Sequence, residues 1–349
     1  MGRTKTMRAG VFTGVGQMKV REAPLPDPPA GHVLLRVLAC GVCGTDHHIY
    51  EGELTDGVAP PVVLGHEIAA RVEAVGAGVD ALSEGQFCAI DPVIGCGCCE
   101  MCRAGRPNLC DRITVIGYRM DGGFAQYLLA PASQVVPMDE SVGPAGGVLC
   151  ETLACVINGH DRLGFRAAGS AMVLGAGTVG LLWAQLLKQS LCSRLIQTEV
   201  VAFRREKAAR LGADVVIDPA AGDLAERVAA ERPDGVDFIV DATGDPTAVE
   251  QAMPLLARGG TFMIFGVCPA GSRVRIDPFE LYNKEARIIA SKMPPRTLGR
   301  SARLIESGLI PCDEIVTATL PLEELAASVA GFNDHRDRHV KVAIDPWAS

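Results

Sequence analysis

Five cysteines occur within fifteen residues of this chain, in the segment DPVIGCGCCEMCRAGRPNLC. Four of them, with the spacing C-x2-C-x2-C-x7-C, are Cys96, Cys99, Cys102 and Cys110. Two-residue gaps let successive thiolates turn toward one ion, and four thiolates close a tetrahedral shell. The spacing therefore predicts a structural zinc that holds a loop without a core of its own. An iron–sulfur cluster, a disulfide pair and uncommitted thiols are the alternatives.

The fifth cysteine, Cys98, does not fit this spacing. One residue separates it from Cys96 and three separate it from Cys102. We therefore expect Cys98 to be a free thiol.

A second set of candidate ligands is dispersed along the first half of the chain. Cys43 lies in CGVCGTDHHIY, His66 in GHE and Glu151 in LCETLACV. One Cys, one His and one carboxylate around zinc would leave a fourth position for water or substrate, which is the pattern of a catalytic site. Each motif alone is weak evidence, because such residues are also common in cores and at helix starts. Sequence spacing cannot show that they converge.

The glycine-rich segment GAGTVG follows an apolar run at 171–174 and begins a helical pattern. Its Gly175 suits a tight turn, Gly177 the approach of backbone N–H groups to a pyrophosphate, and Gly180 close packing of helix on strand. Such a motif is weak by itself, but here it follows the first strand of an alternating series. A glycine turn without a ligand is the alternative.

An acidic residue, Glu199, follows the second apolar run of this series. A carboxylate there would hold the ribose hydroxyls of NAD and would repel the 2′-phosphate of NADP. Arg204 and Arg205 follow closely and would tolerate that phosphate. NAD is therefore the expected cofactor, and NADP is less favoured.

Two kinds of element would have to position these residues. The first 150 residues are rich in Gly and Pro and show short apolar runs between turn signals, which is typical of all-β folds. We expect strands there at 31–38, 69–75 and 86–90. A final strand at 340–344 is too isolated to form a domain, so we expect it to pair with this first half.

From residue 171 onward short apolar runs alternate with helical patterns. Such alternation predicts a parallel sheet with helices on both faces. The expected strands are 171–174, 194–198, 215–217, 236–240, 261–265 and 287–291. The expected helices are 178–189, 203–211, 223–230 and 247–256, with two more in the tail at 300–306 and 322–332.

Composition limits the function classes. The chain has 349 residues, which suggests two domains, and a net charge of −8, which argues against binding to nucleic acid or anionic membrane. It shows no apolar run near the roughly 18–20 residues of a membrane span, and its first residues lack the apolar core of a signal peptide. Thirteen cysteines then favour metal ligands and buried thiols over a disulfide framework. A cytoplasmic protein is expected.

These motifs, in this order, resemble the zinc-containing medium-chain alcohol dehydrogenases, and most closely their polyol and threonine dehydrogenase branch. The resemblance runs from about residue 7 to the end. It implies an α/β fold with a β-rich, GroES-like catalytic domain and a doubly wound, parallel-sheet Rossmann domain. The implied boundaries are 1–152 with 292–349 for the catalytic domain and 153–291 for the dinucleotide-binding domain.

The same resemblance assigns roles to individual residues. Cys43, His66 and Glu151 become the ligands of a catalytic zinc, and Glu67 is able to approach the metal in some states. The remaining implied catalytic residues are Asp46, which would orient His66, and Thr45 and His48, which would form a proton relay. The implied cofactor-binding residues are Gly175, Gly177, Thr178, Val179, Gly180, Glu199, Arg204, Gly266 and Val267.

The expected function is therefore reversible, NAD-dependent oxidation of a secondary alcohol, polyol or amino alcohol, with two zinc ions per chain. The active site is expected in the cleft between the two domains. One alternative is a lyase, epimerase or dismutase on the same scaffold that uses tightly held NAD transiently. Another is a non-catalytic protein that binds zinc and nucleotide, although it would need none of Thr45, His48 or Glu151. The resemblance also implies a homodimer or homotetramer.

Overall fold

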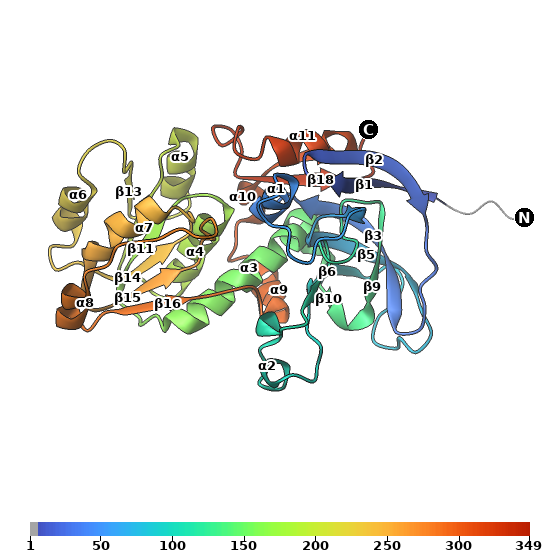
Figure 1. Ribbon diagram of the computed structural model, residues 1–349, viewed down its shortest axis with the longest axis horizontal. Helices are drawn as coiled ribbons and strands as arrows, with labels where there is room; N and C mark the ends of the chain where they lie inside the picture. The colour runs from blue at the N-terminus through green and yellow to red at the C-terminus, as the bar shows by residue number, and fades with distance from the viewer. Residues whose placement is uncertain (1–5) are drawn as a thin grey trace, which may run out of the picture. The chain divides into compact units, whose positions relative to one another are not determined.

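The computed structural model describes residues 6–349. Within it the chain forms two compact units. The first unit contains residues 6–154, Met293–His335 and Lys341–Ser349, and the second contains Cys155–Lys292 and Arg336–Val340. Figure 1 labels the elements of both units.

The first unit is built on a seven-stranded sheet in the order β10-β6-β5-β3-β18-β17, with β9 also paired to β3. A smaller sheet has the order β2-β1-β4, and β7 pairs with β8. The strands are β1 (Thr6–Gly14), β2 (Gln17–Pro24), β3 (His32–Gly41), β4 (Val62–Val63), β5 (Glu67–Val75), β6 (Phe87–Ile90), β7 (Val93–Ile94), β8 (Thr114–Val115), β9 (Tyr127–Pro131), β10 (Val135–Pro137), β17 (Val316–Pro321) and β18 (Lys341–Asp345). The helices are α1 (Gly44–Tyr50), α2 (Glu100–Arg103), α9 (Leu298–Glu306), α10 (Cys312–Ile315) and α11 (Leu325–Ala330).

The three strands predicted in the first half are present as β3, β5 and β6. The predicted final strand is β18, and it pairs antiparallel with β3, with Ala343 opposite Gly41 and Ile344 opposite Cys40. This pairing joins the end of the chain to the strand that immediately precedes Cys43. The prediction that the tail returns to the β-rich half is therefore confirmed.

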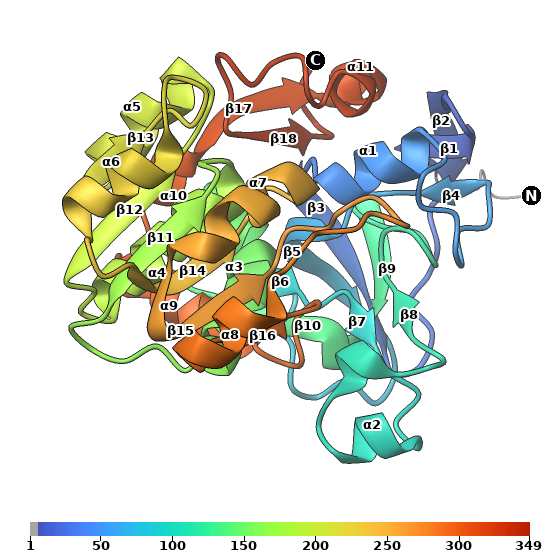
Figure 2. The same ribbon diagram turned by 60° about the vertical axis from the view of Figure 1, so that its left-hand side comes forward.

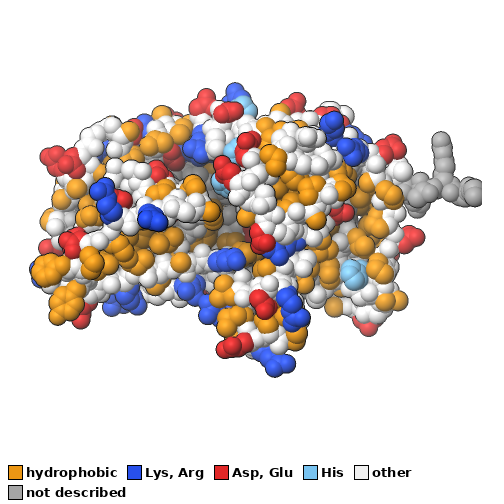
Figure 3. Space-filling view, viewed as in Figure 1, with side chains coloured by type: hydrophobic (Ala, Val, Ile, Leu, Met, Phe, Trp, Pro, Cys, Tyr) orange, Lys and Arg blue, Asp and Glu red, His pale blue; other side chains and the backbone are white. Residues whose placement is uncertain are grey.

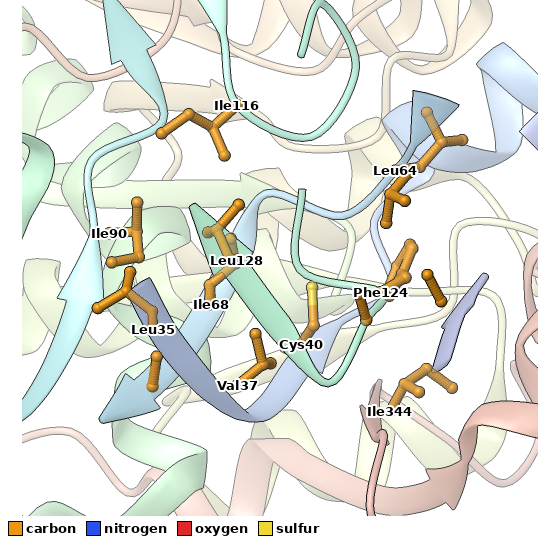
Figure 4. Close-up of a cluster of buried hydrophobic side chains, with 14 of the residues drawn as sticks. Leu35, Val37, Cys40, Leu64, Ile68, Ile90, Ile116, Phe124, Leu128 and Ile344 are labelled. Atoms are coloured by element: carbon orange, nitrogen blue, oxygen red, sulfur yellow. The ribbon is translucent and has the colours of Figure 1, made fainter. Parts of the chain in front are cut away.

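The core of this unit lies between its strands and is mainly aliphatic (Figure 4). Leu35 and Val37 of β3, Ile68 of β5 and Ile90 of β6 are essentially inaccessible to solvent, and Phe124 packs with them. Burial of such side chains contributes roughly 1.5–3 kcal/mol each. The core thus anchors the ends of β3 and β5, where the candidate ligands begin.

The second unit holds a six-stranded parallel sheet in the order β13-β12-β11-β14-β15-β16. Its strands are β11 (Ser170–Leu174), β12 (Arg194–Thr198), β13 (Val215–Ile217), β14 (Val236–Asp241), β15 (Leu256–Ile264) and β16 (Arg287–Ala290). Its helices are α4 (Thr178–Gln189), α5 (Ala202–Arg210), α6 (Leu224–Glu231), α7 (Pro246–Ala252) and α8 (Pro278–Lys284). The doubly wound parallel sheet predicted from the alternation is confirmed.

Chain direction decides which face each helix covers. The chain moves from β11 outward to β13 and then crosses to β14, β15 and β16 on the other side. Because parallel crossovers are right-handed, α4 and α5 cover one face, and α6, α7 and α8 cover the other. Figure 2 shows α7 and α8 in front of the strands. Aspartates 223, 245 and 277 cap α6, α7 and α8 by accepting hydrogen bonds from first-turn N–H groups.

One long helix was not among the predicted elements. Helix α3 (Gly143–Leu163) begins in the first unit and ends in the second. It is long and apolar enough to cross a membrane, but 72% of its most apolar window is buried inside the structure. Burial of this kind is typical of a core helix.

Asp91, directly after β6, gives a pH-dependent prediction for this unit. It is 8% exposed, Val93 donates its N–H to Oδ1 at 3.1 Å, and burial raises the pKa of the carboxyl to about 6. A raised folded-state pKa contributes stability below about pH 4 that is lost as the pH rises through about 6. Asp91→Asn keeps the acceptor, so we expect it to raise the free energy of unfolding by about 1–3 kcal/mol near pH 8 and little near pH 4. Thermal unfolding at both pH values checks this, and an equal shift at both would contradict it.

Candidate metal centres and cofactor loop

The four predicted zinc ligands come together in a lobe that contains β7, α2 and β8. The Sγ atoms of Cys96, Cys99, Cys102 and Cys110 all lie within 4.8 Å of one another. The lobe projects from the strands of its unit, as the position of α2 shows (Figure 1). Four converging sulfur atoms in a segment without its own core fit a structural zinc.

Backbone N–H groups support the sulfur atoms of this lobe. The N–H of Cys99 donates to Cys96 Sγ at 3.4 Å, and the N–H of Cys102 donates to Cys99 Sγ at 3.4 Å. The N–H of Cys98 is the main cause that lowers the pKa of the Cys96 thiol, to about 5, whereas burial raises the pKa of the Cys102 thiol to about 12. N–H donors directed at sulfur favour the thiolate form that metal binding requires.

Cys98 lies outside this group of four. It is exposed, its Sγ is 3.7 Å from Cys96 Sγ, and Arg112 Nη2 lies 3.0 Å from it. The same guanidinium nitrogen is 3.3 Å from Cys96 Sγ. Cys98 therefore lies in the lobe but outside its set of four converging sulfur atoms.

These positions predict different metal contents for two neighbouring substitutions. Cys98→Ser is expected to keep both zinc ions, because it removes no converging sulfur. Cys99→Ser is expected to lose about one zinc per chain and to destabilise the lobe, since structural zinc supplies folding free energy there. Metal analysis of both purified variants checks the assignment. Loss of zinc from the Cys98 variant would contradict it.

A second group of possible ligands lies where β3 ends and β5 begins. The ligand atoms of Cys43, His66 and Glu67 all lie within 4.8 Å of one another. Cys43 is the residue before α1, His66 precedes β5, and Glu67 is the first residue of β5. His66 and Glu67 are buried, with 7% and 1% of their surface exposed.

Glu151, the third ligand named from the sequence, lies on α3 outside this close group. It is 8% exposed, and its charge is one of the causes that raise the pKa of His66. Burial opposes the imidazolium form of His66, but the pKa is raised by Cys43 foremost, and also by Asp46 and Glu151. The ring is thus surrounded by groups that favour a positive charge, which is the environment of a cation site.

Glu67 has a cationic partner that the sequence motifs did not indicate. Its carboxylate forms an ion pair with Lys341 Nζ and accepts a hydrogen bond from Thr152 Oγ1 at 2.8 Å. Lys341 also donates to the Val42 carbonyl oxygen at 3.0 Å. Burial opposes ionisation of Glu67, but Lys341 lowers the pKa of the carboxyl below its usual range. A Cβ on Gly41 would clash with both charged side chains, so the absence of a side chain there makes room for the pair.

Asp46 lies against both members of the Cys43–His66 pair. Its Oδ2 accepts the N–H of Cys43 at 2.9 Å, and its Oδ1 is 3.8 Å from His66 Nδ1. Both Oδ1 and Nδ1 are buried without a hydrogen-bond partner in residues 6–349. Burial raises the pKa of Asp46 to about 6. A metal held by the other ring nitrogen of His66 would fit this arrangement, because a ligand imidazole usually donates its second N–H to a carboxylate.

The two predicted relay residues, Thr45 and His48, lie on helix α1. Thr45 is half-buried, and His48 Nδ1 is 2.6 Å from Glu53 Oε2. The neighbouring ring of His47 donates from Nδ1 to the Val329 carbonyl oxygen at 2.9 Å. His47 therefore holds α1 against α11, whereas the His48 ring contacts Glu53.

The glycine loop joins β11 to α4. Gly175 has a left-handed backbone, with φ at +92°, and a Cβ on Gly180 would collide with the Gly175 carbonyl oxygen. At Gly177 the nearest atom to an added Cβ is Arg204 Nη1, at 3.6 Å. The first and third glycines thus meet steric demands of the fold, whereas a Cβ at Gly177 would clash with no atom and would only touch the end of the Arg204 side chain. Thr178 and Val179 follow in the first turn of α4.

Glu199 lies directly against this loop. Its Oε2 accepts the N–H of Ala176 at 2.8 Å, and its Oε1 accepts the N–H of Val201 at 3.0 Å. Arg204 donates to the His339 carbonyl oxygen, and Arg205 pairs with Asp218 at 2.9 Å. The acidic group is therefore at the loop, and the guanidinium of Arg205 is already paired.

Gly266 and Val267 follow β15 in the same unit. The N–H of Gly266 donates to the Asp241 carbonyl oxygen at 2.8 Å, and a Cβ on Gly266 would meet the backbone of Gly244. Val267 is 81% exposed. The backbone at this strand end is thus packed too closely for a side chain at 266, and Val267 presents its side chain to solvent.

Known proteins share both units of this chain. The alcohol dehydrogenase GroES-like domain matches residues 29–140, and the zinc-binding dehydrogenase domain matches residues 178–306. D-altritol 5-dehydrogenase of Agrobacterium fabrum is 34% identical over 323 residues, which cover 91% of this chain and 94% of that protein.

Two solved structures share the fold of the whole chain. A putative zinc-binding dehydrogenase from Sinorhizobium meliloti 1021, bound to NADP, has a TM-score of 0.94 and 36% identity over 98% of this chain and 100% of its own. A short chain alcohol dehydrogenase from E. coli CFT073, complexed with NADH, has a TM-score of 0.91 and 28% identity over 97% and 99%. This chain therefore belongs to the zinc-binding alcohol dehydrogenase family, resembles its polyol dehydrogenases, and is an oxidoreductase.

Proposed function

We propose that this protein catalyses the reversible oxidation of a secondary alcohol, polyol or amino alcohol to the ketone, with NAD as the hydride acceptor. The observation that carries the proposal is the convergence of Cys43, His66 and a carboxylate in the unit whose sheet ends there. The glycine loop of the second unit supplies the cofactor side of the reaction. The relative from Agrobacterium fabrum is named for a polyol substrate, which supports that class.

The proposed ligands of the catalytic zinc are Cys43, His66 and Glu151, with Glu67 able to approach. When bound, zinc supplies a Lewis acid that lowers the pKa of a hydroxyl, as it does for water from about 15.7 to about 7. The chain's own contribution is to orient the ligands. Asp46, with Oδ1 3.8 Å from His66 Nδ1, orients the imidazole ring, and the ion pair with Lys341 holds the Glu67 carboxylate.

The proposed relay residues for the substrate proton are the Thr45 hydroxyl and His48, with a ribose hydroxyl of the cofactor between them when it is bound, as the family resemblance implies. When bound, NAD would supply the acceptor for the hydride of the carbinol carbon. Gly177 is proposed to let the cofactor's diphosphate approach the backbone, Glu199 is proposed to hold its ribose hydroxyls, and Gly266 and Val267 are proposed to meet the nicotinamide.

We also propose NAD over NADP, because Glu199 places a negative charge at the glycine loop. A 2′-phosphate would have to approach that carboxylate without the help of Arg205, which is paired with Asp218. The structure from Sinorhizobium meliloti is bound to NADP, so both cofactors belong in the assay. A preference for NADP would contradict this part of the proposal.

A homodimer or homotetramer in the cytoplasm is the proposed state. The sheet of the second unit ends at β16, whose outer edge pairs with no strand in residues 6–349. Next to it, α8 exposes Phe279 and Tyr282 by 72% and 80%, and Figure 3 shows hydrophobic side chains gathered there. An open strand edge beside exposed aromatics favours self-association. All thirteen cysteines lie in the described residues and none is in a disulfide, as in a reducing compartment.

The test is a panel of secondary alcohols, polyols and amino alcohols, each assayed with NAD and with NADP. We expect reduced NAD to form with at least one compound and to disappear again when the ketone is added. A purified protein that holds zinc and cofactor but reduces neither nucleotide across the panel would overturn the proposal.

A further inference from the structure

We propose that Glu53 is a positioning residue that fixes the tautomer of His48 and thereby makes its Nε2 the proton acceptor of the relay. The inference rests on the proposed function, because it assigns a partner to one of its relay residues. Its basis is a hydrogen bond of 2.6 Å between His48 Nδ1 and Glu53 Oε2.

The backbone at the end of α1 brings these two side chains together. The N–H of Glu53 donates to the His48 carbonyl oxygen at 2.8 Å, and the N–H of Gly52 donates to the Ile49 carbonyl oxygen at 3.1 Å. Gly52 has φ at +78°. This pair of hydrogen bonds around a left-handed glycine is the Schellman motif, which places the third residue from the helix end beside the second residue after the cap. An apolar contact usually fills that position, whereas here it holds an imidazole and a carboxylate.

The carboxylate decides which ring nitrogen carries the proton. An ionised Glu only accepts hydrogen bonds, so His48 Nδ1 must carry the hydrogen and Nε2 must carry the lone pair. Nε2 is then the ring atom whose lone pair can accept the proton of the proposed relay, which would reach it from Thr45 by way of the bound cofactor's ribose. The Glu53 carboxylate, 2.6 Å from Nδ1, then faces the imidazolium that forms and stabilises it.

The surroundings single out Glu53 as the partner of His48. The His47 ring is 6.0 Å away between centroids and is itself held by Val329, and helix α11, which packs against α1, carries no titratable side chain. Asp334 and His335 follow in the next loop. The side chains of His48 and Glu53 are 41% and 62% exposed, so the pair lies at the surface, where a proton can pass on to water.

Three variants separate charge, geometry and mere proximity. Glu53→Gln keeps an acceptor for Nδ1–H but removes the charge, and Glu53→Ala removes both. Glu51→Gln is the matched control, because Glu51 lies two residues away and its side chain is not in contact with the His48 ring through any hydrogen bond or ion pair of the described chain. The tautomer of His48 is read from its ring nitrogen shifts by NMR on histidine-labelled protein, with His48→Asn assigning the signals.

The wild type, the Glu53→Gln variant and the Glu51→Gln control are expected to show the hydrogen on Nδ1, and Glu53→Ala is expected to lose this preference. Glu53→Ala is also expected to lower kcat about two- to fivefold near neutral pH, to raise the solvent isotope effect, and to regain rate when imidazole buffer is added. Glu53→Gln should stay within about twofold of wild type.

Other outcomes overturn the inference in distinguishable ways. If His48 in the wild type carries its hydrogen on Nε2, Glu53 does not set the tautomer. The same conclusion follows if the tautomer is unchanged in the Glu53→Ala variant. If Glu53→Ala shifts the tautomer of His48 but leaves kcat and the solvent isotope effect unchanged, proton transfer through His48 is contradicted. A wild-type protein that reduces no cofactor contradicts the proposed function and the relay with it, while the NMR arm still decides the tautomer.

Discussion

Cys43→Ala is expected to remove one of two zinc ions and nearly all dehydrogenase activity while leaving the fold intact. Cys43 is half-buried at the start of α1, and its sulfur lies within 4.8 Å of the ligand atoms of His66 and Glu67. Without the thiolate the remaining ligands cannot hold the Lewis acid, whose effect is several kcal/mol on the barrier. A loss of about three orders of magnitude in kcat is therefore expected.

Metal analysis, circular dichroism and the alcohol assay check this result on one preparation. Cys98→Ser is the matched control, since it also removes one thiol but is expected to keep both zinc ions and full activity. Unfolding of the Cys43 variant, with activity retained by a variant of the four-cysteine lobe, would mean that the two metal sites have been assigned in reverse.

Lys341→Met is expected to be the most destabilising single change, by about 3–5 kcal/mol. The Lys341 and Glu67 side chains are 5% and 1% exposed, so removal of the cation leaves a buried carboxylate without its partner. That carboxylate would keep only the hydrogen bond from Thr152. Denaturant unfolding of the purified variant measures the loss.

A second substitution separates the lost charge pair from lost packing. Adding Glu67→Gln to Lys341→Met removes the buried charge but keeps an acceptor for Thr152, so we expect it to restore most of the lost free energy. Lys284→Met is the control for a partly exposed pair: Lys284, 22% exposed, pairs with Glu280 at 2.8 Å on α8 and also donates to the Pro254 carbonyl oxygen, so we expect a loss of only about 1 kcal/mol. Equal losses for the Lys341 and Lys284 variants would show that burial does not set the strength of the pair.

The second unit was predictable because its signals are local. Each strand of its sheet is a short apolar run, and each helix shows its own period, so α4 begins at Thr178 as expected, directly after the glycine loop. The four cysteines of the lobe are also local, because all of them lie within fifteen residues. Spacing alone was therefore enough to predict that their sulfur atoms converge, as they do.

Helix α3 shows where local signals fail. Its first turns contain Gly143, Pro144, Gly146 and Gly147, which argue against a helix in the sequence. A Cβ on Gly147 would lie 2.5 Å from the Cβ of Ala69, so this glycine lets the helix pack closely on β5. The packing of the whole unit overrides the low helix propensity there.

The partners of the candidate catalytic group were equally hidden. Lys341 is a lone lysine at the start of an apolar run, and only the pairing of β18 with β3 brings it to Glu67. The sequence motifs named Glu151 and Glu67 together, but only coordinates could show that Glu67 is the one within 4.8 Å of both Cys43 and His66. Glu151 remains the proposed third ligand.

The most direct test of the central claim follows the hydride itself. An active alcohol from the panel, carrying deuterium on its carbinol carbon, is mixed with the zinc-loaded protein and NAD, and the cofactor is analysed by mass spectrometry. We predict one deuterium in the reduced nicotinamide for each ketone formed. If the alcohol is consumed but the cofactor is still oxidised and unlabelled at the end, the dehydrogenase reaction is contradicted. Such a result would indicate a reaction in which the cofactor takes up the hydride transiently and returns it.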